Sequence, residues 1–145
     1  IMDNAAKPPI ITQLEDFYRH LSLAKIASLA ELYSENIEFV DPVHHLYGLA
    51  PLEEYFKHLL VNTEYCDFQF GHCLLGQGEC SLTWQMRFSH PKLGKGKEIV
   101  VDGISLLKFT DKIYYHRDYY DLSAMLHDHV PLLGWLSKKL KDGLR

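Results

Sequence analysis

The feature that most constrains the fold is a change in hydrophobic period at Thr63. Before it, apolar residues recur at helical spacing over residues 10–21 and 26–33. After it, apolar and polar residues alternate in four segments, which predicts strands over residues 65–75, 80–90, 97–109 and 112–121. The breaks between these segments are short, as in an antiparallel meander. Helices followed by strands predict an α+β fold, with the helices packed on one face of a curved antiparallel sheet.

Shorter elements complete the expected order. The segment NIEFVD at residues 36–41 reads as a strand that Pro42 stops. Pro51 suits the first turn of a third helix, because a missing N–H costs nothing there. A C-terminal helical segment is expected from Leu122 onward, interrupted at Pro131.

The composition fits one globular domain and excludes several classes of function. The chain has 145 residues, 47% hydrophobic, with a net charge of −4, which predicts a single domain over 1–145 and no nucleic-acid partner. We expect residues 1–9 to be a disordered or artificial lead-in. No apolar run approaches the ~20 residues that span a bilayer, so no membrane partner is expected. The three cysteines form no CxxC pair and no export signal is visible, which predicts reduced thiols in the cytoplasm.

The segment EIVVDGISLLKF carries apolar residues on both faces of the expected strand. Ile99, Val101 and Leu107 alternate onto one face, and Val100, Ile104 and Leu106 onto the other. Helices can cover only one of these faces, and a strand that is apolar on both needs cover on both. A homodimer is therefore expected.

Asp41 is the first candidate for chemistry. Strand alternation places it on the same face as Ile37 and Phe39. An inward orientation would desolvate the carboxylate and raise its pKa toward the range useful to a general base. Asp41 could equally cap the turn before Pro42, a common role for aspartate. The residues alone leave both interpretations open.

The second candidate is YYHRDYYDL at residues 114–122. Alternation predicts one face with Tyr114, His116, Asp118 and Tyr120, where His116 and Asp118 project side by side. We predict no metal site, because none of the histidine spacings places two ligands on one helix face and no HExxH motif is present. No nucleotide-binding motif appears either, so no cofactor is expected.

The order of elements, with FVDP, LYG and HRDYYDL at their positions, resembles the nuclear transport factor 2-like superfamily. Within it, the chain is most similar to the SnoaL-like group, which includes polyketide cyclases, ketosteroid isomerases and limonene epoxide hydrolases. The resemblance covers residues 10–136 and implies a cone-shaped sheet with a hydrophobic pocket inside. This superfamily hosts enzymes and binding proteins alike.

The resemblance implies roles for individual residues. Asp41 in FVDP is similar in position to the isomerases' base, and Tyr18 in EDFYRHL to their oxyanion-donating tyrosine. Ser105 stands where those enzymes have a protonated aspartate. Asp118 in HRDYYDL is similar to a catalytic aspartate of the epoxide hydrolases. Their arginine and second aspartate are replaced near TWQMRF by Trp84 and Met86.

Together these observations predict a protein that binds an apolar, carbonyl-containing small molecule. The leading hypothesis is a cofactor-free isomerase, cyclase or dehydratase with Asp41, Asp118, Tyr18 and His116 as catalytic groups. The alternative is a non-catalytic ligand-binding or accessory protein with the same fold. The expected pocket residues are Phe39, Phe17, Tyr55, Trp84, Met86, Ser105, Tyr120 and His44.

Overall fold

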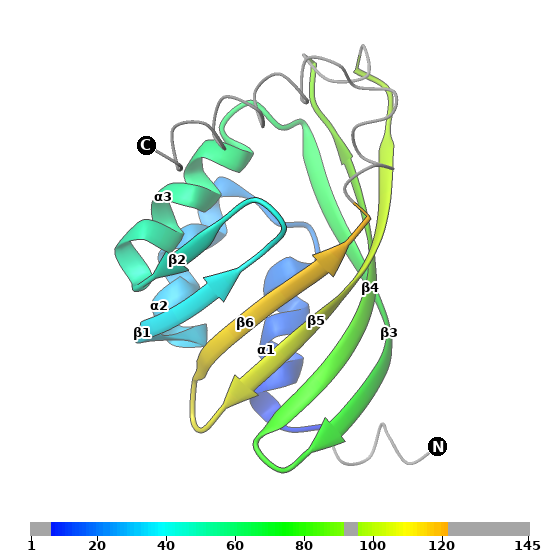
Figure 1. The fold of residues 1–145 in the computed structure, drawn as a ribbon. Coiled ribbons are helices and arrows are strands. Elements are labelled where there is room, and N and C mark those ends of the chain that lie inside the picture. Colours follow the sequence, from blue (N-terminus) through cyan, green and yellow to red (C-terminus); the bar gives the residue numbers. More distant parts are fainter. Residues whose placement is uncertain (1–6, 92–95, 122–145) are drawn as a thin grey trace.

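A six-stranded mixed sheet with helices on one face is formed by residues 7–91 and 96–121, the part of the chain that the computed structural model describes (Figure 1). The helical elements are α1 (Pro9–Tyr18), the 3-10 helix η2 (Leu23–Ser28), α2 (Leu29–Leu32) and α3 (Leu49–Leu60). The strands are β1 (Tyr33–Val40), β2 (His45–Tyr47), β3 (Tyr65–Gly76), β4 (Glu79–Ser89), β5 (Ile99–Phe109) and β6 (Ile113–Tyr120). The expected C-terminal helical segment lies outside the described residues.

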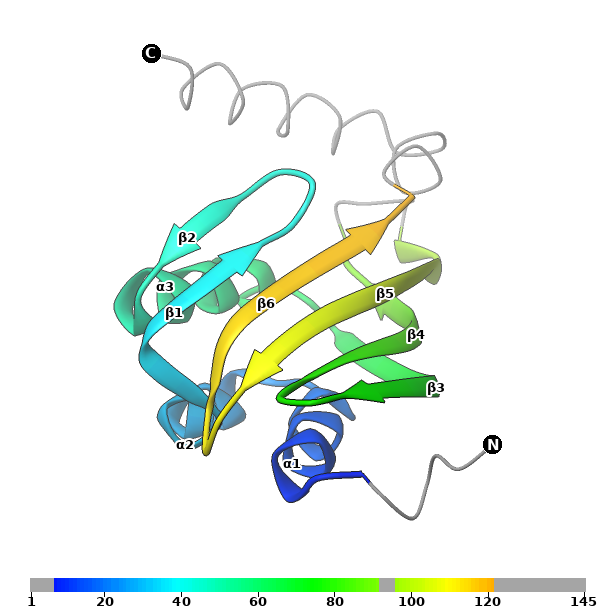
Figure 2. The ribbon, with the colours of Figure 1, turned by 60° about the horizontal axis from the view of Figure 1, so that its bottom comes forward.

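The strands follow the order β2-β1-β6-β5-β4-β3. Strands β3 to β6 form the predicted antiparallel meander. Strand β1, however, pairs with β6 in parallel, so the sheet is mixed rather than antiparallel throughout. This pairing sets Phe39 opposite His116. The sheet is strongly bent and open, and the helices lie on its concave side (Figure 2). The α+β architecture is therefore confirmed.

Helix α1 begins earlier than the sequence suggested. It starts at Pro9, where the fixed φ of proline suits the first turn. The ammonium of Lys7 forms an ion pair with the nearly buried carboxylate of Glu15 at 2.9 Å. Residues 7–9 thus belong to the folded domain and not to the expected lead-in.

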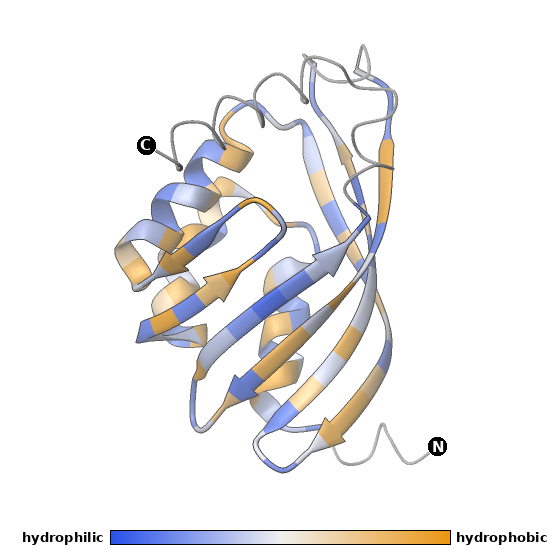
Figure 3. Cartoon of the chain, viewed as in Figure 1, coloured by the Kyte–Doolittle hydropathy of each residue, from blue (hydrophilic) through white to orange (hydrophobic). Residues whose placement is uncertain are grey.

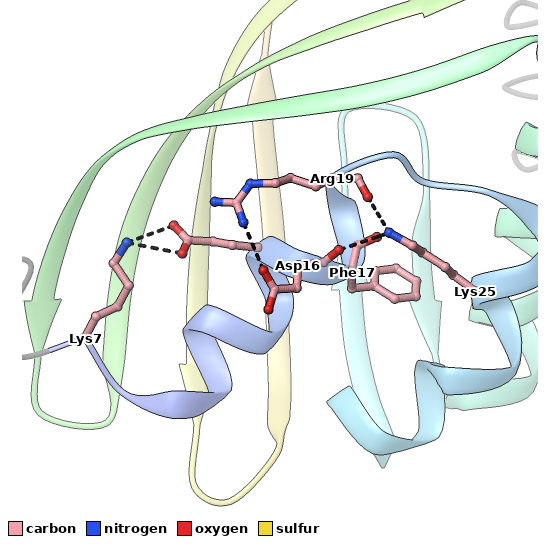
Figure 4. A network of polar contacts seen from close by, with 6 residues as sticks. Lys7, Asp16, Phe17, Arg19 and Lys25 are labelled. Carbon is pink, nitrogen blue, oxygen red and sulfur yellow. Dashed lines mark hydrogen bonds and ion pairs between the residues drawn. The ribbon is translucent and has the colours of Figure 1, made fainter.

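The end of α1 is held by Lys25 of η2. Its ammonium donates hydrogen bonds to the backbone carbonyls of Asp16, Phe17 and Arg19, where the last turn of a helix leaves carbonyls without partners (Figure 4). The guanidinium of Arg19 meanwhile pairs with the Asp16 carboxylate at 2.9 Å. Because α1 is fixed at this end, the side chain of its last residue, Tyr18, is held inside the cone.

The helix predicted over residues 26–33 is shorter in the structure. Its first part is η2, and α2 ends at Leu32. Tyr33 begins β1, because it pairs with Ile113 of β6. The strand predicted at residues 36–41 therefore starts three residues earlier and ends at Val40. Tertiary pairing overrides the local helical spacing here.

The core lies between the concave face of the sheet and the helices, where hydrophobic and hydrophilic residues alternate along the strands (Figure 3). Ile99, Val101 and Leu107 of β5 are buried, whereas Val100 on the opposite face is 40% exposed. Each fully buried side chain of this size contributes about 1.5–3 kcal/mol. Among the described helices, none is both long and apolar enough to cross a bilayer.

Candidate active site

The inward face of β6 carries the polar side chains of the site. His116 is buried, and Asp118 and Tyr120 are partly buried on the same face, as strand alternation predicted. The prediction was wrong for Tyr114, which is 41% exposed. A register shift between Lys108 and Phe109 of β5 breaks the alternation at that point.

A line of hydrogen bonds runs from β4 across β5 to β6. The indole N–H of Trp84 donates to Ser105 Oγ at 2.8 Å, and the Ser105 hydroxyl donates to Asp118 Oδ1 at 2.5 Å. The same carboxylate oxygen lies 2.7 Å from Nε2 of His116. Because an ionised carboxylate only accepts, Oδ1 receives two donors at once.

The line continues from His116 into the helical layer. Nδ1 of His116 lies 2.8 Å from the hydroxyl of Tyr33, and that hydroxyl lies 2.6 Å from the hydroxyl of Tyr18. Both tyrosines are buried. Four strands and one helix thus contribute to one continuous polar chain inside an apolar core. We call the six residues Trp84, Ser105, Asp118, His116, Tyr33 and Tyr18 the interior chain.

A small cavity opens beside the interior chain. Its volume is about 10 Å³ counted over the centres of water-sized spheres, which is room for about one water molecule. Five of its lining residues were predicted for the site, and Leu14, Phe68 and Phe70 were not; the predicted ones are Tyr18, Trp84, Ser105, His116 and Asp118.

The indole of Trp84 is held against the sheet by a glycine. Trp84 pairs with Gly103 of β5, and a Cβ on Gly103 would lie 2.3 Å from the indole ring. Only glycine therefore permits the ring to lie flat over β5 and to reach Ser105. The ring also forms an edge contact with Phe68, with centroids 5.2 Å apart. Both rings line the cavity.

Burial governs the protonation of the tyrosines in the interior chain. Desolvation raises the pKa of Tyr18 well above its usual value, and the nearby charge of Asp118 adds to this. Desolvation also raises the pKa of Tyr33, although its hydrogen bond with Tyr18 opposes the shift. Both phenols therefore stay neutral at physiological pH and can pass hydrogen bonds along the chain without ionising.

Asp41 lies directly after β1, with its side chain only 2% exposed. Its Oδ1 accepts the backbone N–H groups of Val43 and His44 at 2.8 and 2.6 Å. Nδ1 of His44 lies 3.3 Å from the same oxygen, and the hydroxyl of Tyr55 donates to Oδ2 at 2.8 Å. Asp41 thus caps the turn over residues 41–44, which contains Pro42, and capping is one of the two interpretations left open by the sequence.

The pKa of Asp41 contradicts the sequence-based expectation. Burial pushes the pKa upward, but the contacts with His44, the Val43 amide and the Tyr55 hydroxyl outweigh it, so the pKa of Asp41 is lowered. The expectation of a raised pKa was wrong because alternation predicts burial but not the donors that meet the carboxylate. Nε2 of His44 is buried and has no hydrogen-bond partner among the described residues.

Aromatic side chains join Asp41 to the interior chain. The ring of Phe39 lies 5.6 Å from Tyr55 and 4.7 Å from His116, measured between centroids. Burial raises the pKa of Tyr55 and of Tyr120, and the charges of Asp41 and Asp118 raise both further. The two carboxylates therefore share one electrostatic environment, although only Asp118 lines the cavity.

Six of the eight predicted pocket residues do not line this cavity: Phe39, Tyr55, Tyr120, His44, Phe17 and Met86. Phe17 lines a separate hollow of about 280 Å³ between α1, η2 and α2. Met86 on β4 is partly buried against the core and does not line the cavity beside Asp118. In the described part of the chain, no group of three or more His, Cys, Asp or Glu side chains could hold a metal ion.

The sequence analysis missed Tyr33 and three cavity residues. Phe68 and Phe70 carried a usable signal, since alternation along residues 65–70 places them on one face with the buried Cys66. Leu14 belonged to the apolar stripe of the first helix but was not linked to the site. Tyr33 carried no signal, because its spacing fitted a helix.

Comparison with known proteins agrees with this architecture. The family model described as "SnoaL-like domain" matches residues 14–116. No curated protein matches the chain. A protein with a ketosteroid isomerase-like fold from Catenulispora acidiphila superposes with a TM-score of 0.72 at 15% identity, covering 86% of this chain and 94% of that one.

Two further solved structures are similar in fold. One, from Shewanella putrefaciens CN-32, is described as a SnoaL-like polyketide cyclase, with a TM-score of 0.70 at 15% identity, covering 87% of this chain and 98% of that one. The other is a LEH-like epoxide hydrolase from M. tuberculosis, with a TM-score of 0.68 at 11% identity, covering 88% of this chain and 94% of that one. Identities this low establish the fold alone. With a family model matched over most of its length, the chain belongs to the SnoaL-like family.

Proposed function

We propose that this protein binds an apolar, carbonyl-containing small molecule inside the cone and acts on it by proton transfer without a cofactor. Isomerisation, cyclisation and dehydration are the reactions that such a site serves. The observation that carries the proposal is the interior chain, of which Asp118, His116 and Tyr18 line one cavity. Hydrogen-bonded polar groups in an apolar core are costly to assemble, and active sites are where they gather.

Asp118 is the better candidate for the base. Its Oδ1 is occupied by Ser105 and His116, its side chain is 17% exposed, and among the described residues no hydrogen bond reaches its Oδ2. Asp41 has partners on both oxygens and a lowered pKa, which makes it a weaker acceptor of a proton. We therefore assign proton abstraction to Asp118 and a positioning role to Asp41.

The reaction then follows from the positions of these groups. Asp118 takes a proton from the carbon next to the carbonyl, and Tyr18 donates a hydrogen bond to the oxygen of the resulting enol or enolate. Asp118 returns the proton to another carbon of the same molecule, so the net proton count does not change. A positioned acid–base pair of this kind contributes roughly 10²–10⁴-fold to the rate.

Binding a larger molecule requires the aromatic rings to move. The cavity admits about one water molecule, whereas ligand pockets in proteins usually measure several hundred Å³. Phe68 and Phe70 are the lining rings outside the interior chain, and their movement is the expected way to enlarge the cavity. The same small volume favours the second candidate, a non-catalytic accessory protein whose pocket opens only for a tight-binding ligand.

The remaining expectations on partners and compartment belong to this proposal. The outer face of β5 carries the exposed Val100 and the partly buried Ile104 and Leu106, and a second copy of the chain is the expected cover. The cysteines Cys66, Cys73 and Cys80 are buried and not joined by disulfides, which supports a reducing, cytoplasmic compartment.

Exchange of α-protons for deuterium tests the function without knowledge of the substrate. A panel of apolar ketones, including cyclohexanone and cyclohexenone, is incubated with the protein in deuterated buffer and followed by NMR. We expect catalysed exchange that Asp118→Asn abolishes. Asp111→Asn, in the exposed turn before β6, is the matched control and should keep the exchange.

The outcomes separate the two candidates. Ketone binding without exchange, unchanged by Asp118→Asn, would support the accessory protein and contradict the enzyme. Exchange that survives Asp118→Asn but is lost in Asp41→Asn would restore Asp41 as the base and overturn our assignment.

A further inference from the structure

We infer that the protonation state of His116 sets the direction of the hydrogen bonds from His116 to Tyr18, and thereby decides whether Tyr18 accepts or donates a hydrogen bond in the cavity. The protein should therefore bind hydrogen-bond-accepting ligands, such as ketones, preferentially when His116 is protonated. This inference deepens the proposed function and rests on it for the class of ligand.

One end of the interior chain has a fixed direction. The indole of Trp84 can only donate, so the single proton of the Ser105 hydroxyl is directed to Asp118. An ionised Asp118 can only accept, so Nε2 of His116, 2.7 Å away, carries a proton in both states of the ring. Only Nδ1 of His116 changes between acceptor and donor.

With His116 neutral, Nδ1 is a bare acceptor. The hydroxyl of Tyr33 at 2.8 Å then donates to it. The oxygen of Tyr33 in turn accepts the proton of Tyr18 at 2.6 Å. The only hydroxyl proton of Tyr18 is then used in the bond to Tyr33, so Tyr18 can only accept hydrogen bonds from a group in the cavity. A ketone oxygen in the cavity would meet acceptors on Tyr18 and Asp118 alike.

With His116 protonated, every hydrogen bond from Nδ1 outward reverses. Nδ1–H donates to Tyr33, and Tyr33 donates to Tyr18. The proton of Tyr18 is now free to point into the cavity, which Tyr18 lines. The site becomes a hydrogen-bond donor at the position where the proposed reaction develops negative charge.

Because His116 is buried, an arrangement in which only some of the hydrogen bonds between His116 and Tyr18 have reversed is costly. His116 is 2% exposed, so a neutral ring whose Nδ1 lost the Tyr33 proton would leave a buried acceptor without a partner. The groups that face His116 are Tyr18 from α1, Tyr33 and Phe39 from β1, and Asp118 from its own strand. Leu107 of β5 pairs beside it, and Tyr55 of α3 is separated from it by Phe39. Within residues 7–91 and 96–121, Asp118 is the one charged group in contact with His116, and it compensates the imidazolium.

The consequence for binding is a proton linkage. When His116 starts neutral, the protein takes up one proton at His116 as it binds a ketone that needs the Tyr18 donor. The affinity for this ketone should therefore fall by about tenfold for each unit of pH rise while His116 of the free protein is neutral. A donor ligand of the same shape, such as an alcohol, should show no such fall.

Nuclear magnetic resonance of the whole protein tests the switch without any ligand. Histidine and tyrosine are labelled with ¹⁵N and ¹³C, and the His116 ring nitrogens and the Tyr18 Cζ are followed through a pH titration. We expect the Nε2–H form in neutral His116 and a Tyr18 Cζ shift that follows His116 titration. In Tyr33→Phe the Tyr18 shift should no longer follow it, whereas Tyr47→Phe, on the exposed edge strand β2, should behave as the wild type.

A neutral His116 with its proton on Nδ1, or a Tyr18 resonance indifferent to His116, would overturn the inference. So would a Tyr33→Phe variant in which Tyr18 still followed His116.

Calorimetry with cyclohexanone and cyclohexanol tests the ligand class. In the wild type we expect proton uptake by the protein when it binds cyclohexanone and none when it binds cyclohexanol. In Tyr18→Phe we expect the affinity for cyclohexanone to fall about threefold to tenfold. Cyclohexanone binding without pH dependence would contradict the inference and leave the proposed function intact. An intact switch in the resonances without binding of either ligand would support the switch and contradict the proposed function.

Discussion

Asp41 and Asp118 are both carboxylates with little exposed surface, yet their surroundings differ in kind. Asp41 is met by local donors, the amides of the turn that it caps and the side chains of His44 and Tyr55. Asp118 is met by Ser105 and His116, side chains that face one cavity. A carboxylate whose partners are turn amides holds the chain in place. One whose partners are titratable or hydroxyl side chains beside a cavity is available for chemistry.

The largest expected effect separates the two carboxylates by activity. Asp118→Asn should reduce the ketone exchange rate by roughly 10²–10⁴-fold, because it removes the proton acceptor. Asp41→Asn should reduce it less than about tenfold, since an amide oxygen still accepts the turn amides. The ratio of the two rates, measured on the same ketone, checks the comparison. Equal losses would show that the two carboxylates act together.

For stability we expect Asp41, and not Asp118, to be the more important carboxylate. Asp41→Ala removes the acceptor for two partly buried amides and the Tyr55 hydroxyl, and we expect a loss of about 2–3 kcal/mol in the free energy of unfolding. Asp41→Asn, which keeps an acceptor, serves as the matched control. Urea unfolding monitored by circular dichroism provides the measurement. A variant Asp41→Ala as stable as the wild type would refute the capping role.

The third prediction concerns Gly103, which leaves room for the Trp84 indole and so supports the hydrogen bonds that lead to Asp118. Gly103→Ala places a Cβ where the Trp84 indole lies, 2.3 Å from its nearest ring carbon. We expect a loss of about 1–3 kcal/mol in the free energy of unfolding, together with the loss of the Trp84 hydrogen bond to Ser105. Thermal unfolding and the indole N–H resonance report these two effects. If the alanine protein keeps both, the close approach of the ring to β5 is not required.

The smallest expected effect is a fall in the free energy of unfolding at acidic pH. The pKa of Asp41 is lowered from its usual 3.8 in the folded protein, so its carboxylate binds a proton more readily in the unfolded chain. The stabilisation that comes from the lowered pKa is fully present above the pKa of Asp41 in the unfolded chain. It is lost as the pH falls through the pKa of Asp41 in the folded protein. The Asp41→Asn protein should lack this part of the acid dependence. Identical acid profiles for both proteins would contradict the lowered pKa.

Much of the fold was predictable because it depends on local patterns. The period of two over residues 65–121 predicted the meander, and Pro51 indicated the first turn of α3. Alternation also placed His116 and Asp118 on one inward face. These patterns are read from neighbouring residues, because the side chains of a strand alternate whatever the strand pairs with.

The site itself depended on contacts between distant residues. Tyr33 and His116 are 83 positions apart and meet because β1 joins β6 in parallel, a pairing that alternation does not encode. The donors around Asp41 arise from the turn geometry and from a tyrosine on α3. Alternation thus placed Asp41 on the face of Ile37 and Phe39, but neither its donors nor the direction of its pKa could be predicted from sequence.

The sequence by itself determined which side chains share a face along most of each strand, since their period follows from backbone geometry. Only the tertiary structure decided which of them touch, because the pairing of β1 with β6 and the packing of α1 bring Tyr18, Tyr33 and His116 into one line. The pKa of a buried group depends on the donors and charges around it, and the fold supplies these from residues far apart in the chain.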